Sequence, residues 1–224
     1  MTNVLHERLI SHFDPHSPEA EAYRTLRTNL QFSMLDGELH TLVITSSGPG
    51  EGKSTTAANL AITLAQTGRA VLLCDCDLRR PSQHQIFGVP NTAGLTSLLL
   101  DARLSDTVQD TGIEHLRLMT SGPIPPNPSE LLESKRMEQV VRELASSCDI
   151  VIFDTPPIGA VTDAALLASR VDGVVLVVSS GQTPRDQAKR AKALLDKVKA
   201  RVLGVVINNA RPGTRDQYHY FSEQ

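Results

Sequence analysis

The sequence predicts an α/β fold in which helices cover both faces of a doubly wound, mostly parallel sheet. Three observations predict it. Short β-branched and aliphatic runs alternate with longer stretches of helical character. Most of these runs are apolar throughout, as expected of strands that are buried on both faces of a parallel sheet. The chain has 224 residues, a length that fits one such domain.

The predicted strands and helices follow one another along the chain in βαβ order. The runs that we interpret as strands are 41–45, 70–74, 116–120, 149–153, 173–178 and 202–207. The stretches that we interpret as helices between them are 55–66, 134–145, 162–168 and 184–199. Thr183 and Pro184 predict an N-cap and a first helical residue for the last helix. This order predicts a doubly wound sheet with right-handed crossovers.

Two segments lie outside this alternation. Ser17 and Pro18 open a helix that we expect to run to about Met34. Residues 211–224 are polar and aperiodic, so we expect a flexible tail. The predicted division is therefore an N-terminal segment at 1–38, one globular domain at 39–210 and a tail at 211–224.

Composition and charge exclude several classes of protein. Hydrophobic residues make up 40% of the chain, which is typical of a globular protein. The net charge of −3 argues against binding nucleic acid through overall positive charge. The three cysteines are expected to be reduced thiols in a cytoplasm. Residues 1–10 carry charges where a secretory signal needs an apolar run. No apolar run approaches the ~20 residues that cross a bilayer, so we expect membrane contact only through a partner.

The strongest local signal is a glycine-rich loop that follows the first predicted strand and opens a helix. Its residues are Ser46-Ser47-Gly48-Pro49-Gly50-Glu51-Gly52-Lys53-Ser54-Thr55. Glycines let backbone N–H groups turn toward phosphate oxygens at the positive end of a helix. Lys53 adds a charge for the β- and γ-phosphates, and the Ser54 hydroxyl is placed for Mg²⁺. Ser47 stands where the usual pattern has its first glycine, and a glycine-rich turn without a phosphate is the alternative interpretation.

Carboxylates lie at the ends of two other predicted strands. Asp75 and Asp77 follow the strand at 70–74 and, on an extended chain, project to the same side. Asp154 follows the strand at 149–153. Ligands bind at the carboxyl ends of strands in open α/β sheets, so the three acids predict one site with the loop. There they would hold the water molecules of Mg²⁺ or accept a proton from an incoming hydroxyl. Taken alone, such acids are solvated strand ends.

Cys74 and Cys76 raise the question of a metal site. Only Cys148 remains as a further thiolate, and the pair faces away from the expected phosphate side. We therefore favour small core residues over metal ligands.

Together these motifs resemble those of the bacterial tyrosine kinases of capsule and exopolysaccharide biosynthesis, over about residues 21–211. The family carries a loop like Ser-Ser-X-Pro-Gly-Glu-Gly-Lys-Ser, an aliphatic-Asp-X-Asp-X-Arg strand, whose arginine is Arg79 here, and an aliphatic-Asp-X-X-Pro strand. Further matching stretches are 80–81, 87–90, 94–96 and 125–132. The resemblance implies a phosphate-loop (P-loop) kinase domain at 39–210 that uses ATP and Mg²⁺.

The resemblance also implies roles for single residues. Lys53 would contact phosphates, Ser54 would ligate Mg²⁺, Asp77 and Asp154 would hold the metal's waters, and Asp75 would be the base toward tyrosine. The loop residues that would bind ATP are Gly48, Pro49, Gly50, Glu51, Gly52, Lys53, Ser54 and Thr55. Asn208 and Arg211, at the end of the last predicted strand, lie where this class of ATPase holds adenine, and an amide can pair with the adenine edge. An ordinary turn at the strand end is the alternative interpretation.

Assembly and partners are implied in the same way. The helix before the first strand carries Glu21, Arg24 and Arg27, which fit the family's Glu-X-X-Arg-X-X-Arg pattern for ring-like self-assembly. Without the family pattern, a solvated helix face with salt bridges is the alternative interpretation. Tyr218 and Tyr220 are the expected acceptors for autophosphorylation, offered by one copy to a neighbour's site; an aromatic tail without this role is the alternative interpretation. The family implies a membrane-embedded activator of the polysaccharide co-polymerase type and an opposing tyrosine phosphatase. The expected location is the cytoplasm, at the inner face of the plasma membrane.

Three other functions compete with this one. A partition or positioning ATPase of the related ParA or MinD type would carry an additional lysine near Gly48 or Pro49, and the chain has no lysine before Lys53. A small-molecule kinase would pair one acidic strand end with an arginine-rich lid. An assembly scaffold would bind ATP without kinase activity.

Overall fold

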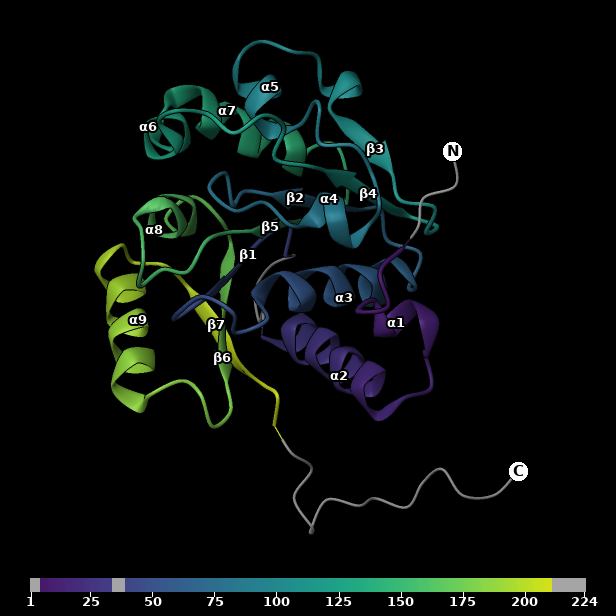
Figure 1. Ribbon diagram of the computed structural model, residues 1–224, viewed down its shortest axis with the longest axis vertical. Helices are drawn as coiled ribbons and strands as arrows, with labels where there is room; N and C mark the ends of the chain where they lie inside the picture. Colours follow the sequence, from purple (N-terminus) through teal and green to yellow (C-terminus); the bar gives the residue numbers. More distant parts are fainter. Residues whose placement is uncertain (1–4, 34–38, 211–224) are drawn as a thin grey trace.

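The computed structural model describes residues 5–33 and 39–210, which form a seven-stranded sheet between layers of helices (Figure 1). The strands are β1 (Thr41–Ser46), β2 (Val71–Asp75), β3 (Val108–Asp110), β4 (Leu116–Met119), β5 (Ile150–Asp154), β6 (Gly173–Ser179) and β7 (Val202–Asn208). The helices are α1 (Ile10–Phe13), α2 (Pro18–Phe32), α3 (Lys53–Ala65), α4 (Gln83–Ile86), α5 (Leu95–Leu99), α6 (Pro128–Glu133), α7 (Lys135–Ala145), α8 (Asp163–Ala168) and α9 (Arg185–Lys197). A short 3-10 helix, η1 (Leu104–Asp106), precedes β3.

The strands lie in the order β3-β4-β2-β5-β1-β6-β7, and only β3 runs antiparallel to its neighbour. This confirms the predicted mostly parallel, doubly wound sheet. β5 lies between β1 and β2, and Asp75 is directly opposite Asp154 in the β2–β5 register. The strand order therefore brings the ends of all three motif-bearing strands together.

The sheet is buried on both faces by aliphatic side chains. One face packs against α3, and α1 and α2 in turn pack on α3 (Figure 1). The other face packs against α5, α7, α8 and α9, whose buried residues include Leu144 and Leu167. Strands covered in this way read as continuous apolar runs, which is why the sequence pattern was informative.

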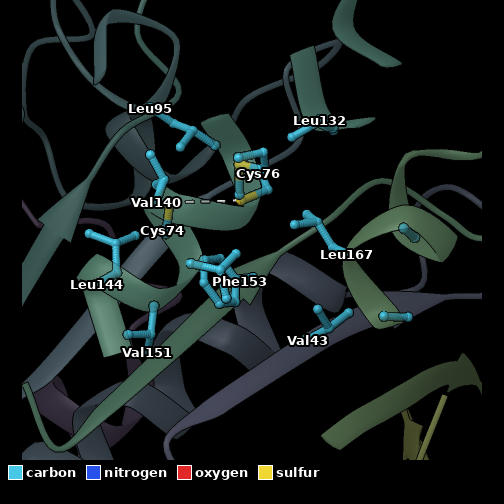
Figure 2. Packing of buried hydrophobic residues seen from close by; sticks show 14 of the residues in the cluster. Val43, Cys74, Cys76, Leu95, Leu132, Val140, Leu144, Val151, Phe153 and Leu167 are labelled. Atoms are coloured by element: carbon cyan, nitrogen blue, oxygen red, sulfur yellow. Dashed lines mark hydrogen bonds between the residues drawn. The ribbon is translucent and has the colours of Figure 1, made fainter. Parts of the chain in front are cut away.

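The two cysteines of the Cys-X-Cys motif lie in the hydrophobic core between the sheet and helices α5, α7, α8 and α9. Figure 2 shows Cys74 and Cys76 among Leu95, Val140 and Phe153, with 3.7 Å between the two sulfur atoms. Neither residue is exposed, and burial raises the pKa of the Cys76 thiol well above its usual range. The prediction that they are core residues is confirmed.

Every predicted strand is present with bounds that differ by at most one residue, and the predicted helices differ by at most two. Ser17 caps α2 by accepting from the Ala20 N–H at 3.2 Å. One cap prediction is wrong, because Pro184 and not Thr183 is the N-cap of α9. The pattern also missed β3, α1, α4, α5 and α6, which have only three to six residues each and so carry little periodicity.

No helix in the described part of the chain has both the length and the apolar character to cross a membrane.

Candidate active site

The glycine-rich loop connects β1 to α3, as predicted. Gly50 and Gly52 have φ angles of +76° and +91°, a left-handed conformation that glycine adopts without strain. Gly52 is the N-cap of α3, and Lys53 is the first helical residue. The helix therefore points its free N–H groups and its positive dipole end at the loop. Pro49 is exposed at the tip, whereas Ser54 and Thr55 are half-buried in the first turn.

The Glu51 side chain turns into the loop and braces it. Its carboxylate accepts the N–H groups of Ser47 at 2.8 Å and Gly48 at 3.0 Å, together with the Ser47 hydroxyl at 2.7 Å. The Thr183 hydroxyl also donates to the Glu51 carboxylate, and Thr183 therefore does not cap α9. Only 5% of Glu51 is exposed. Glu51 thus shapes the loop, and the N–H groups of Ser47 and Gly48 are already engaged.

Two glycines allow close approach from elsewhere in the fold. A Cβ at Gly52 would overlap the side-chain amide of Asn208, which donates to the Glu51 carbonyl at 3.0 Å. A Cβ at Gly48 would overlap the Gln187 amide nitrogen on α9. The structure places Asn208 against the loop, and its predicted contact with adenine stays a prediction. Gln187 fills the space that a side chain at Gly48 would need.

Lys53 lies between two of the three predicted carboxylates. Its Nζ is 3.0 Å from Asp77 Oδ2 and 3.7 Å from Asp154 Oδ1, and it donates to Ser54 Oγ at 3.1 Å. Burial lowers the Lys53 pKa, but Asp154 and Asp77 outweigh that effect and raise it overall. The structure therefore joins the loop, the end of β5 and the segment after β2 in one cluster of charges.

Asp75 and Asp77 have different surroundings, because β2 ends at Asp75. The Asp75 carboxylate is unexposed and accepts backbone N–H groups from Ser82 and Gln83 at 2.9 Å and from Asp77 at 3.1 Å. Burial, with the nearby charge of Asp154, raises the Asp75 pKa to about 8. A tyrosine hydroxyl could reach this carboxylate only after the segment that follows β2 exposes it. Its role as a base stays a prediction.

Gln83, at the start of α4, is a site residue that the sequence reasoning missed. Its side-chain amide donates to Asp154 Oδ2 at 2.8 Å and to the Ser54 carbonyl at 3.1 Å. It lies eight residues beyond Asp75 in a helix of four residues, and no local pattern marks it.

A second missed contact anchors the segment after β2. The Arg79 guanidinium forms two hydrogen bonds, at 2.9 and 3.1 Å, with the unexposed carboxylate of Asp163. Ser129 Oγ donates to the same carboxylate and accepts from Arg79. The motif arginine thus ties this segment to α6 and α8.

The donor set around Lys53 fits a magnesium ion that comes with a nucleotide. A hydroxyl and carboxylate oxygens are the ligands that Mg²⁺ prefers, directly or through water. Asp154 Oδ1 is buried and has no hydrogen-bond partner among the residues described. Within the same residues, no group of three or more His, Cys, Asp or Glu side chains is placed to hold a metal ion.

The predicted assembly residues are engaged within the chain. Arg24 pairs with Glu21 at 2.6 Å and donates to the Pro15 carbonyl at 2.6 Å. Arg27 donates to the Thr63 carbonyl of α3 at 2.7 Å. Three other predicted residues, Arg211, Tyr218 and Tyr220, lie outside the described residues.

Comparison with known proteins agrees with this geometry. A family model described as ParA: NUBPL iron-transfer P-loop NTPase matches residues 38–223. The chain is 47% identical to the tyrosine-protein kinase YwqD of Bacillus subtilis, over 97% of the chain and 92% of that protein. The crystal structure of the chimerical protein CapA2B2 superposes with a TM-score of 0.87 at 44% identity, covering 92% of the chain and 91% of that structure. The kinase domain of the Escherichia coli tyrosine kinase ETK also gives a TM-score of 0.87, at 33% identity, covering 95% and 84%.

These relatives match nearly the whole chain, and the loop and the two acidic strand ends lie together as a nucleotide site requires. The P-loop of this chain lacks the early lysine of the partition ATPases. The chain belongs to the bacterial tyrosine-protein kinases and is a nucleotide-dependent protein-tyrosine kinase built on the P-loop fold.

Proposed function

We propose that the protein uses Mg²⁺-bound ATP to phosphorylate Tyr218 and Tyr220 of another copy of itself. The observation that carries this proposal is the position of Lys53 between Asp77 and Asp154, at 3.0 and 3.7 Å. When nucleotide and a divalent cation bind, the lysine would pair with phosphate oxygens and the two acids with the cation's water molecules. One preformed cluster thus supplies both kinds of contact.

Residues of the loop bind the triphosphate in this proposal. The first N–H groups of α3 have no partner within the helix and are free for phosphate oxygens. Ser54 supplies the hydroxyl for Mg²⁺, and Asp77 and Asp154 hold the water molecules around it. Magnesium, when bound, neutralises negative charge on the transferring phosphate. Asn208 and Arg211 hold the adenine.

The reaction moves one phosphoryl group from ATP to a tyrosine oxygen. The bond between the γ-phosphorus and the ADP oxygen breaks, a bond forms from that phosphorus to the tyrosine oxygen, and the hydroxyl proton leaves to a base. Asp75 is the proposed base, and its raised pKa makes it a better proton acceptor than an ordinary aspartate once its carboxylate is ionised.

The family suggests the setting in which this reaction acts. We infer that copies of the chain assemble in a ring through Glu21, Arg24 and Arg27 of the segment at 1–38. Each copy contributes a kinase domain at 39–210. The tail at 211–224 carries the acceptors. The kinase would be recruited to the inner face of the plasma membrane by an activator of the polysaccharide co-polymerase type. Phosphorylation, opposed by a tyrosine phosphatase, would regulate capsular or exopolysaccharide synthesis and export.

Phosphosite mapping tests the reaction. The full chain is incubated with Mg²⁺ and ATP, with and without a candidate activator, and its phosphotyrosines are located by mass spectrometry. We expect phosphate on Tyr218 and Tyr220 and none in a Lys53→Met variant. Label that persists in that variant comes from another enzyme, and absence of tail phosphotyrosine with the activator present contradicts the proposed acceptors.

Light scattering tests the assembly. The double variant Arg24→Ala and Arg27→Ala should have a lower mass than the unchanged protein. Because Arg27 also bonds α3, circular dichroism must show that the variant is folded. An unchanged mass would remove the argument for a ring.

A further inference from the structure

The hydrogen bonds of the Gln83 side chain determine which end of its amide is the nitrogen and which is the oxygen. It is fully buried, and its Nε2 donates to Asp154 Oδ2 at 2.8 Å and to the Ser54 carbonyl at 3.1 Å. A carboxylate and a carbonyl can only accept, so exchanging the amide nitrogen and oxygen would lose both hydrogen bonds. The amide therefore occupies one oxygen of Asp154 and leaves the other, Oδ1, directed elsewhere.

The same residue contacts all three sequence motifs. Its backbone N–H donates to Asp75 Oδ2 at 2.9 Å at the end of β2. Its side chain reaches Ser54 in the P-loop and Asp154 at the end of β5. The Gln83 side chain thus bridges the start of α3 and the end of β5.

Two buried oxygens around this contact have no hydrogen-bond partner among the residues described: Gln83 Oε1 and Asp154 Oδ1. Buried oxygens without a hydrogen bond are rare in folded proteins, and a bound water or ion is the usual reason for them. Asp154 Oδ1 lies 3.7 Å from Lys53 Nζ, on the side where phosphate and cation are expected.

We propose that Gln83 is a positioning residue of the magnesium site. It holds Asp154 so that Oδ1 meets the waters of the bound cation, and its own Oε1 accepts a hydrogen bond from a water that enters with that cation. The inference rests on the proposed metal role of Asp154. Gln83 would then contribute to nucleotide binding in the presence of Mg²⁺, but not to binding of the nucleotide without the metal.

The variant Gln83→Met tests this inference, because methionine has a similar length but no amide. The matched control is Gln85→Met, in the same helix but with an exposed side chain. The affinity for ADP is measured by calorimetry with Mg²⁺ and with EDTA. The ratio of the two affinities is the readout, and circular dichroism reports folding.

In the unchanged protein and in Gln85→Met, Mg²⁺ should strengthen ADP binding by the same factor. In Gln83→Met that factor should fall by about tenfold, which corresponds to one well-placed hydrogen-bonding group, while binding in EDTA changes less than about twofold. If Gln83→Met does not fold, Gln83→Asn keeps an amide that is one methylene shorter and should show the same selective loss.

The outcomes separate this inference from the proposed function. An unchanged factor in Gln83→Met overturns it, as does an equal loss of affinity with and without Mg²⁺, which would make Gln83 a structural residue only. If the unchanged protein binds ADP equally well with Mg²⁺ and with EDTA, the metal role of Asp154 itself fails.

Discussion

Replacing Glu51 by alanine should destabilise the protein before any nucleotide binds. The carboxylate accepts two backbone N–H groups, from Ser47 and Gly48, and two hydroxyl groups, from Ser47 and Thr183. The carboxylate and the two N–H groups lie in a part of the loop that is closed to solvent, since Gly48 is buried and Ser47 is 2% exposed and Glu51 5%. Alanine would leave the two N–H groups without an acceptor.

The size of the effect follows from those contacts. Each buried N–H that loses its acceptor costs about 1–3 kcal/mol, so Glu51→Ala should lower the free energy of unfolding by about 2–6 kcal/mol. In Glu51→Gln the amide oxygen still accepts both N–H groups, and the two hydroxyls can rotate to accept from the new NH₂. This variant loses only the assistance of the charge, about 1–2 kcal/mol.

Urea unfolding followed by circular dichroism measures these differences, because the chain has no tryptophan to report on them. Glu133→Ala is the matched control, since Glu133 is exposed and should change the stability by less than about 0.5 kcal/mol. We also expect weaker ADP binding in Glu51→Ala, because the loop is no longer preorganised. The reasoning is refuted if Glu51→Ala is as stable as the control or if glutamine is as damaging as alanine.

Three further predictions follow from other contacts. Gly50→Ala and Gly52→Ala both put a side chain at positive φ, a backbone strain that costs about 1–2 kcal/mol. Of these two positions, only at Gly52 would the new Cβ overlap another side chain, so the ADP affinity measured by calorimetry should fall far more in Gly52→Ala. Equal losses of affinity in the two variants would contradict this. Asp163→Asn removes the charge that faces Arg79 and should lower the stability by about 1–3 kcal/mol in urea unfolding, whereas an unchanged midpoint would show that the pair is unimportant. Iodoacetamide should label the half-buried Cys148 slowly, since burial raises its pKa, and should leave the other two cysteines unlabelled until urea is added, as mass spectrometry would show; rapid labelling of all three in the folded protein would argue against the buried pair.

The strands could be predicted closely because each is an apolar run, and such runs are a local property. The loop was equally readable, because glycines, Lys53 and Ser54 must be consecutive to wrap a phosphate at a helix N-terminus. The cap of α9 was predicted wrongly for the opposite reason. Thr183 has the right type for an N-cap, but a carboxylate 132 residues away in the chain, that of Glu51, takes its hydroxyl.

The sequence by itself determined the α/β class, the P-loop and the acids at the ends of two strands, because each depends on neighbours within about ten residues. Only the tertiary structure decided that β5 lies between β1 and β2, that Gln83 holds Asp154, and that Asp163 anchors Arg79. The last two contacts join residues 71 and 84 positions apart. Local patterns carry no information on such pairs, because packing of the whole chain determines which buried polar groups meet.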